Sequence, residues 1–271
     1  MKIQKILKSK VTKNAGWLIG GRVYHMALAF VVGLLTARYL GPGNYGLINY
    51  AATYTAFFSS FCTLGINSVI VKNFVDHPEE EGETIGSAIV LRAISSALSL
   101  VMMVCITLIV DRGETTTHWV VVLCGVGVLF QVMDTLNYWF QCKLQSKYAA
   151  IATAISYTVV SAYKVWLLFT GKSVEWFAVS TSIDYLVAAM VLLALYKKQH
   201  GPQFSCSLRK AKELLGSSRH FILAGLMVSI YDSTDKFMLK QVMNEAEVGF
   251  YSTAVSLCNT WVFLLTALID S

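Results

Sequence analysis

Ionisable side chains lie inside several long apolar stretches of this 271-residue chain. A charge near the centre of a bilayer costs ~2.5–3.5 kcal/mol on insertion scales, so each one needs a partner or a water-filled cavity. Such residues mark substrate or ion paths more often than sites of bond making. Four are acids and four are bases: Asp134, Asp184, Asp232, Asp235, Arg22, Arg92, Lys164 and Lys236.

The spacing of these residues places them on polar helix faces, because positions three or four apart lie on one side of a helix. Arg22 and His25 are one turn apart, and Asp184 follows Thr181 by three residues. Longer polar stripes run through two further stretches: Thr153, Tyr157, Ser161 and Lys164, and Ser229, Asp232, Ser233 and Lys236 with Asp235 beside them. Together the stripes predict a shared hydrophilic interior.

Two simpler interpretations stay open. Ion pairs such as Asp232 with Lys236 would only hold helices together. Arg22 and Arg92 lie near predicted helix ends, where long side chains can reach the membrane interface. Lys164 and Asp184 lie further from any predicted interface, and they are therefore the strongest candidates for a functional path.

No catalytic or cofactor motif accompanies them. The chain has neither a G-x-x-x-x-G-K-[ST] nor an H-E-x-x-H sequence. We interpret the six cysteines as small apolar residues and the acidic segment 76–83 as a solvated loop rather than a metal site. The sequence therefore predicts no enzyme, no cofactor and no metal.

The surrounding composition is that of a membrane protein. Hydrophobic residues make up 55% of the chain and charged residues only 14%, whereas about a quarter of an ordinary soluble domain is charged. Apolar stretches of about 20 residues recur, each long enough to cross a bilayer as a helix. We predict an all-α polytopic membrane protein with about eight spans, at residues 15–38, 46–71, 85–110, 119–140, 149–170, 174–196, 219–240 and 248–269.

The basic residues predict the orientation. Of the 22 Lys and Arg, fourteen fall on the side of the N-terminus and four on the other side, while the remaining four lie inside spans. Basic loops face the cytoplasm, so the N-terminus is predicted to be cytoplasmic and the first span to be an anchor. Because the net charge of +6 comes from these short loops, we expect no nucleic-acid partner.

The spans divide into a predicted six-helix lobe (1–200), a cytoplasmic linker (201–218) and the first two helices of a second lobe (219–271). Within the linker, the basic and partly amphipathic stretch Leu208–Leu215 suits contact with membrane lipids. A weak parallel repeat relates the hairpin that begins at Trp17 to the one that begins at Phe221, and parallel repeats are typical of transporters.

One segment resembles a known family motif. Residues 37–47, Ala-Arg-Tyr-Leu-Gly-Pro-Gly-Asn-Tyr-Gly-Leu, look like the A-R-[YF]-L-G-P-x-x-[YF]-G signature of bacterial polysaccharide flippases, the Wzx-type O-antigen and capsule transporters. These belong to the superfamily that also contains the multidrug and toxin extruders and the lipid II flippase. Segments 65–73, 138–148, 233–239 and 248–254 resemble further elements of the family. The signature residues here are Arg38, Gly41, Pro42, Gly43 and Gly46, and Gly41-Pro42-Gly43 is expected to form a tight outer turn between two helices.

The resemblance implies a non-enzymatic function at the bacterial inner membrane. Its substrate would be an undecaprenyl-diphosphate-linked oligosaccharide, flipped from the inner to the outer leaflet by rocking of two lobes. Its partners would be that substrate, membrane lipids and the polysaccharide polymerase and ligase machinery. A cationic cavity suits a diphosphate, with Lys164, Arg22 and Lys236 as the candidates and Lys164 first.

Alternatives from other classes remain. Family members usually have 12 to 14 helices in two six-helix lobes, so a chain of about eight suggests a fragment or a truncated product. A non-transporting remnant or an assembly partner is therefore one alternative. A multidrug or cation antiporter on the same scaffold is the other, although Arg22 and His25 in the first span favour an anionic substrate.

Reporter fusions test the predicted orientation. Fusions at three predicted inner loops should report the cytoplasm, because basic residues concentrate there, and fusions at three predicted outer loops should report the periplasm. A periplasmic signal after Lys210 would overturn the orientation. The inner positions are Glu80, Gln145 and Lys210, and the outer positions are Gly43, Gly113 and Asn244.

Overall fold

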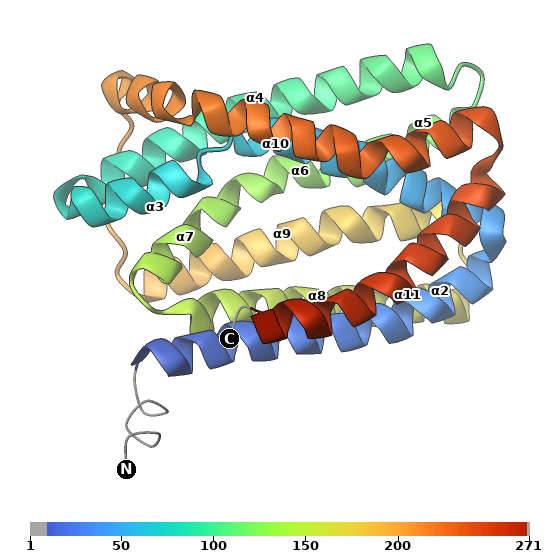
Figure 1. Cartoon of the computed structure of the whole chain (residues 1–271), viewed down its shortest axis with the longest axis horizontal. Helices are drawn as coiled ribbons and strands as arrows, with labels where there is room; N and C mark the ends of the chain where they lie inside the picture. Colours follow the sequence, from blue (N-terminus) through green and yellow to red (C-terminus); the bar gives the residue numbers. More distant parts are fainter. Residues whose placement is uncertain (1–9, 270–271) are drawn as a thin grey trace.

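The computed structural model describes the backbone of residues 10–269 and the side chains of residues 16–258 except Leu18. Within these residues every regular element is a helix, which confirms the predicted all-α class (Figure 1). The elements are α2 (Lys10–Thr63), α3 (Asn67–Asp76), η1 (Pro78–Glu80), α4 (Glu81–Val110), α5 (Thr115–Gly125), α6 (Gly127–Phe130), η2 (Gln131–Asp134), α7 (Thr135–Cys142), α8 (Ser146–Thr170), α9 (Val174–Lys198), α10 (Leu208–Val242) and α11 (Glu245–Ile269).

Long apolar helices confirm a polytopic membrane protein. The described residues contain six stretches long and apolar enough to span a bilayer: Ile19–Asp76, Pro78–Val110, Thr115–Cys142, Ser146–Thr170, Val174–Lys198 and Leu208–Val242. The first of these, at 58 residues, joins the first two predicted spans. The predicted last span falls in α11, where the side chains from residue 259 onward lie outside the described part. The count of eight therefore stays a prediction.

Gly41 divides α2 into two arms. Its backbone has φ 70° and ψ 173°, a conformation that favours glycine because a side chain would clash, while the residues around it are helical. Pro42 follows as the first residue of the second arm, where its fixed φ suits a helix start. The predicted turn Gly41-Pro42-Gly43 is thus present, but Gly41 is its one residue with a positive φ. Arg38 is exposed just before it.

The helices run side by side between two ends (Figure 1). One end, which we call the N-terminal end, holds the start of α2 together with α3 and the connections α7–α8 and α9–α10. The other end, which we call the Gly41 end, holds the bend of α2 and the connections α4–α5, α8–α9 and α10–α11. This alternation matches the predicted order of inner and outer loops, while the orientation in the membrane stays a prediction.

Helices α10 and α11 pack on the preceding helices, α11 along α2 and α10 along α2 and α4. A Cβ atom at Gly46 would overlap the backbone carbonyl oxygen of Glu245, and one at Gly249 would overlap that of Pro42. Glycine at these two positions lets the second arm of α2 and the start of α11 approach closely. The predicted division into lobes is not tested by these contacts.

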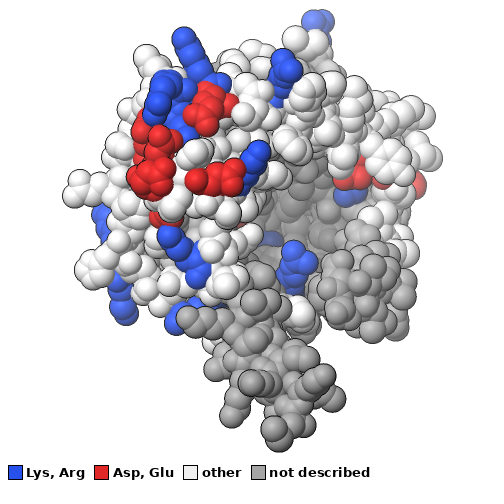
Figure 2. All heavy atoms as spheres, turned by 60° about the vertical axis from the view of Figure 1, so that its left-hand side comes forward, with Lys and Arg blue, Asp and Glu red and all other residues white. Residues whose placement is uncertain are grey.

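The acidic segment at the N-terminal end is only partly solvated, which corrects the prediction of a solvated loop. Glu81 is buried and accepts hydrogen bonds from Trp139 Nε1 (2.9 Å) and from Lys143. Glu80 pairs with Lys210 Nζ at 2.6 Å. Figure 2 shows acidic and basic side chains gathered on this face. Among the described residues no group of acids, His or Cys could hold a metal ion.

Candidate functional site

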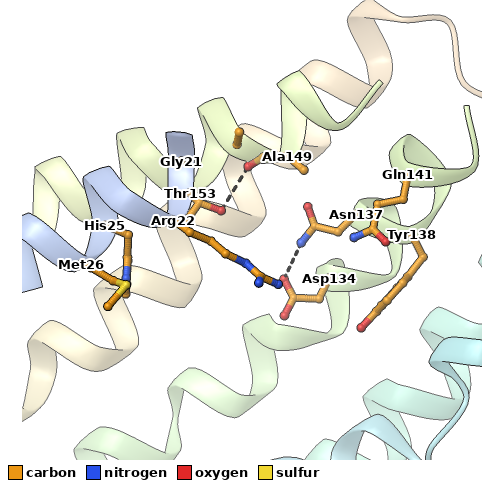
Figure 3. A pocket seen from close by; sticks show the side chains of 11 residues that line it. Gly21, Arg22, His25, Met26, Asp134, Asn137, Tyr138, Gln141, Ala149 and Thr153 are labelled. Atoms are coloured by element: carbon orange, nitrogen blue, oxygen red, sulfur yellow. Dashed lines mark hydrogen bonds between the residues drawn. The ribbon is translucent and has the colours of Figure 1, made fainter. Parts of the chain in front are cut away.

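A cavity of about 480 Å³ lies near the N-terminal end, between α2, η2, α7 and α8 (Figure 3). Its lining combines charged, amide and aromatic groups with small residues that leave the space open. The molecular surface is hollowed on this side (Figure 2). The lining residues are Gly21, Arg22, His25, Met26, Asp134, Asn137, Tyr138, Gln141, Ala149, Ala150 and Thr153. We call this the Arg22 cavity.

Arg22 and Asp134 face each other across this cavity. The guanidinium of Arg22, from the first arm of α2, points toward the carboxylate of Asp134 (Figure 3). Asp134 also accepts a hydrogen bond of 3.2 Å from the amide of Asn137. The sequence marked Asp134 as an acid within a span but did not assign it to the path. The cavity therefore contains charges of both signs.

A break in the helix places Asp134 there. The predicted span 119–140 is divided into α5, α6, η2 and α7, with Asp134 ending the 3-10 turn η2. Gly125 and Gly127 flank the first division and pack so closely that an added Cβ would collide with Met103 and Tyr185 respectively. Irregular backbone at membrane depth is tolerated where protein buries it or where it lines a cavity.

Arg92 is buried, with only 1% of its surface exposed. It donates hydrogen bonds to Thr135 Oγ1 (3.1 Å) and to Asn67 Oδ1, and its guanidinium lies 5.7 Å from the ring centroid of Tyr138. The alternative that Arg92 reaches the membrane interface is therefore wrong. Its contacts join α3, α4 and α7 behind the wall of the Arg22 cavity.

His25 lies one turn deeper than Arg22, and its ring contacts Tyr157 of α8 with the ring centroids 3.8 Å apart. His25 and Met26 also line a smaller cavity of about 200 Å³ between the first arm of α2 and α11, where Thr253 contributes a hydroxyl. His25 thus belongs to two adjoining cavities.

A third cavity, of about 250 Å³, contains Lys164 and lies between both arms of α2, α8 and α9. We call it the Lys164 cavity. It shares Ala29, Gly33 and Tyr45 with the smaller cavity lined by His25. The Arg22 cavity, this smaller cavity and the Lys164 cavity thus follow one another along α2. The hydroxyl of Ser161 lines the Lys164 cavity and has no hydrogen-bond partner within the described structure.

Lys164 is half-buried, and among the described side chains no carboxylate lies within 4.0 Å of its ammonium. Asp184 is close enough for its charge to act on Lys164, but it accepts a hydrogen bond from Ser156 instead. The direct pair that a purely structural role for Lys164 would require is therefore not formed.

The three predicted residues of α10 do not join this path. Asp232 and Asp235 are exposed and Lys236 is half-buried, and none of them lines the three cavities. Asp235 accepts hydrogen bonds from Tyr251 of α11 and from the backbone N–H of Lys236 (2.7 Å). The structure thus brings together Arg22, His25, Lys164 and Asp184, and it leaves the α10 residues apart.

Sequence reasoning missed a charged cluster at the Gly41 end. Lys240, interpreted as an outer-loop cation, is buried and pairs with Asp111 (2.9 Å) and with Glu114. Burial opposes ionisation of Glu114, but hydrogen bonds from Lys240 and Thr117 outweigh it and hold the pKa of this carboxyl below its usual value. The position of Lys240 near a predicted loop did not indicate that it would pair with Asp111 and Glu114.

Comparisons with known proteins agree with this architecture. Residues 11–270 match the family described as Polysaccharide biosynthesis protein. The fold is similar to that of a MOP superfamily transporter from Pyrococcus furiosus Vc1 (DSM3638), with 14% sequence identity and a TM-score of 0.70. The similarity covers 94% of this chain and 61% of the other, whose description says that the reverse polarity of its binding pocket suggests a different function. A search of curated proteins found no match.

Two arginines provide a matched test of this site. Arg92→Met should lower the free energy of unfolding by about 3–5 kcal/mol, because it removes the buried hydrogen bonds to Asn67 and Thr135 and a buried cation whose charge acts on Asp134. Arg22→Met changes an exposed side chain that faces a cavity, so it should change stability by less than about 1 kcal/mol. Thermal unfolding in detergent measures both. Equal losses of stability would contradict these assignments.

Proposed function

The chain belongs to the polysaccharide biosynthesis protein family, since residues 11–270 match that family, and we propose that it is a transporter that flips an undecaprenyl-diphosphate-linked oligosaccharide across the bacterial inner membrane. The predicted resemblance to polysaccharide flippases is thereby confirmed at the level of the family. The substrate, the direction of transfer and the cytoplasmic N-terminus are part of this proposal.

The observation that carries the proposal is the unpaired ammonium of Lys164. A lysine within a membrane span is costly unless it is paired or faces water, and this one lines a cavity without a direct carboxylate partner. A diphosphate offers several oxygens that accept charge-assisted hydrogen bonds. The hydroxyl of Ser161 supplies a further free donor in the same cavity.

The row of cavities suits a substrate with a polar head and an apolar tail. Arg22 lies at the N-terminal end of the row, and Lys164 of α8 lies further along the row. Both could therefore act in turn on one anionic group. The prenyl tail would remain in the surrounding lipid while the sugar passes along the wet interior. Rocking around a central site would then complete transfer, with no bond made or broken.

A cation antiporter is the second candidate, because acids lie along the same row. Asp134 lines the Arg22 cavity, and the charge of Asp184 acts on both His25 and Lys164. A cationic substrate would need these carboxylates, whereas a diphosphate would need the bases. The two functions therefore predict opposite outcomes for loss of Lys164.

Lys164→Ala should abolish export of surface polysaccharide while membrane abundance stays normal, because the diphosphate loses its principal cation. Lys164→Arg should retain part of the export by keeping the charge. Lys172→Ala is the matched control: Lys172 is exposed in the connection just after α8, so export should be unchanged. Surface polysaccharide is measured by immunoblot in cells that depend on this protein for export.

Two outcomes would contradict the proposal. Normal export by Lys164→Ala would remove this residue from the mechanism. Reduced abundance of Lys164→Ala, restored by adding Asp184→Ala, would show that Lys164 serves as an ion-pair partner. Drug resistance that needs Asp134 but not Lys164 would favour the antiporter.

A further inference from the structure

A buried ionic cluster joins α10 and α11 to the preceding helices at the Gly41 end. Lys240 Nζ of α10 lies 2.9 Å from Asp111 and also contacts Glu114, both in the connection between α4 and α5. Glu245, the first residue of α11, lies 3.7 Å from the same ammonium. One cation therefore links two helices to a loop that precedes them by more than a hundred residues.

Asp111 is the centre of this cluster, and its side chain is fully buried. Besides Lys240, it accepts hydrogen bonds from Tyr50 (3.1 Å), Tyr54 (3.2 Å) and Gln241 (3.1 Å). Tyr50 and Tyr54 belong to the second arm of α2. A carboxylate held by four donors is well satisfied only while these helices stay together.

The helix backbones meet at the same end. Gly46 and Gly249 let α2 and α11 touch without intervening side chains. The ring of Phe237 from α10 stacks near Tyr50, with the centroids 6.1 Å apart. Polar, aromatic and backbone contacts between α2 and the α10–α11 pair thus meet at the Gly41 end.

The N-terminal end is different. The Arg22 cavity lies there, and the molecular surface is hollowed on that side (Figure 2). Among the described residues, the surface is therefore hollowed toward the N-terminal end, whereas the cluster around Lys240 and Asp111 joins the helices at the Gly41 end. A transporter that exposes its path to each side in turn must reverse this arrangement.

We propose that the cluster of Lys240, Asp111, Glu114, Tyr50 and Tyr54 is a latch that keeps the Gly41 end closed and must separate for the path to open there. This proposal rests on the proposed transport function and names the contacts that must break during transport.

The chemistry of the cluster suits reversible separation. Desolvation largely offsets the attraction within a buried ion pair, so the pair adds specificity more than net stability. Three carboxylates surround one ammonium, and the buried Asp111 regains water when the helices move apart, whereas Glu114 and Glu245 are already partly exposed. Interfaces of this kind have two discrete arrangements rather than a continuous range.

The test measures access of water to each end with single cysteines. The six native cysteines are replaced by alanine, and Ser233→Cys or Thr153→Cys is added. Ser233 is buried on α10 and precedes Lys240 in that helix, whereas Thr153 lines the Arg22 cavity. A membrane-impermeant maleimide is applied to each side of membrane vesicles, and no substrate is present.

Lys240→Met should speed labelling of Ser233→Cys from the Gly41 side about fivefold or more, the lower range of couplings between protein states. The same change should slow labelling of Thr153→Cys, because opening one end closes the other. Tyr50→Phe should produce a smaller shift in the same directions, since it removes one donor to Asp111 and keeps the ring.

Lys210→Met is the matched control, because Lys210 is an equally buried lysine in α10 that pairs with Glu80 at the N-terminal end. It should not speed labelling of Ser233→Cys. Unchanged labelling of Ser233→Cys in Lys240→Met, or faster labelling of both cysteines, would overturn the latch. If Lys240→Met does not accumulate in the membrane, the labelling of Ser233→Cys and Thr153→Cys in Tyr50→Phe tests the latch by the same criteria. Loss of export in Lys164→Ala together with unchanged labelling in Lys240→Met would support the transport function and contradict the latch.

Discussion

The cost of placing charge in hydrocarbon determines the surroundings of each ionisable side chain in the spans of this protein. Every buried cation in the described spans is hydrogen-bonded by protein groups, paired with a carboxylate or open to a cavity. Arg92 satisfies the constraint through hydrogen bonds to neutral side chains and Lys240 through carboxylates, and both tie helices together. Lys164 satisfies it differently, because it lines a cavity and its ammonium has neither a hydrogen-bond partner nor a carboxylate within 4.0 Å among the described side chains. This difference separates structural charges from the one that we assign to the substrate.

Much of this arrangement follows from the sequence. Apolar length and helical spacing predicted the all-α membrane fold, and three residues of the predicted polar stripes, Arg22, His25 and Lys164, line neighbouring cavities. The Gly41 turn followed from its glycine and proline. Partners across helices did not follow, because periodicity gives the face of a residue but not its neighbour. An interface position therefore stayed open for Arg92, although the structure binds it to Asn67 and Thr135.

The same reasoning explains the errors at the ends. Glu81 and Lys240 lie near predicted loops, where charge is ordinarily solvated, so loop position suggested solvent for both. In the structure each meets a partner that is distant in the sequence, Lys143 for Glu81 and Asp111 for Lys240. These long-range pairs lie at opposite ends of the helices, and the Arg22 cavity lies near the N-terminal end. That asymmetry is what a rocking transporter requires.

Transfer of substrate in proteoliposomes tests the central claim most directly. The purified chain is reconstituted with an undecaprenyl-diphosphate-linked oligosaccharide, and an external glycosidase measures how much sugar reaches the outer leaflet. The account predicts transfer above that of empty liposomes, loss of transfer in Lys164→Ala, and no transfer of the same sugar on a neutral prenyl lipid. Equal transfer of the charged and the neutral lipid, or undiminished transfer by Lys164→Ala, would contradict it.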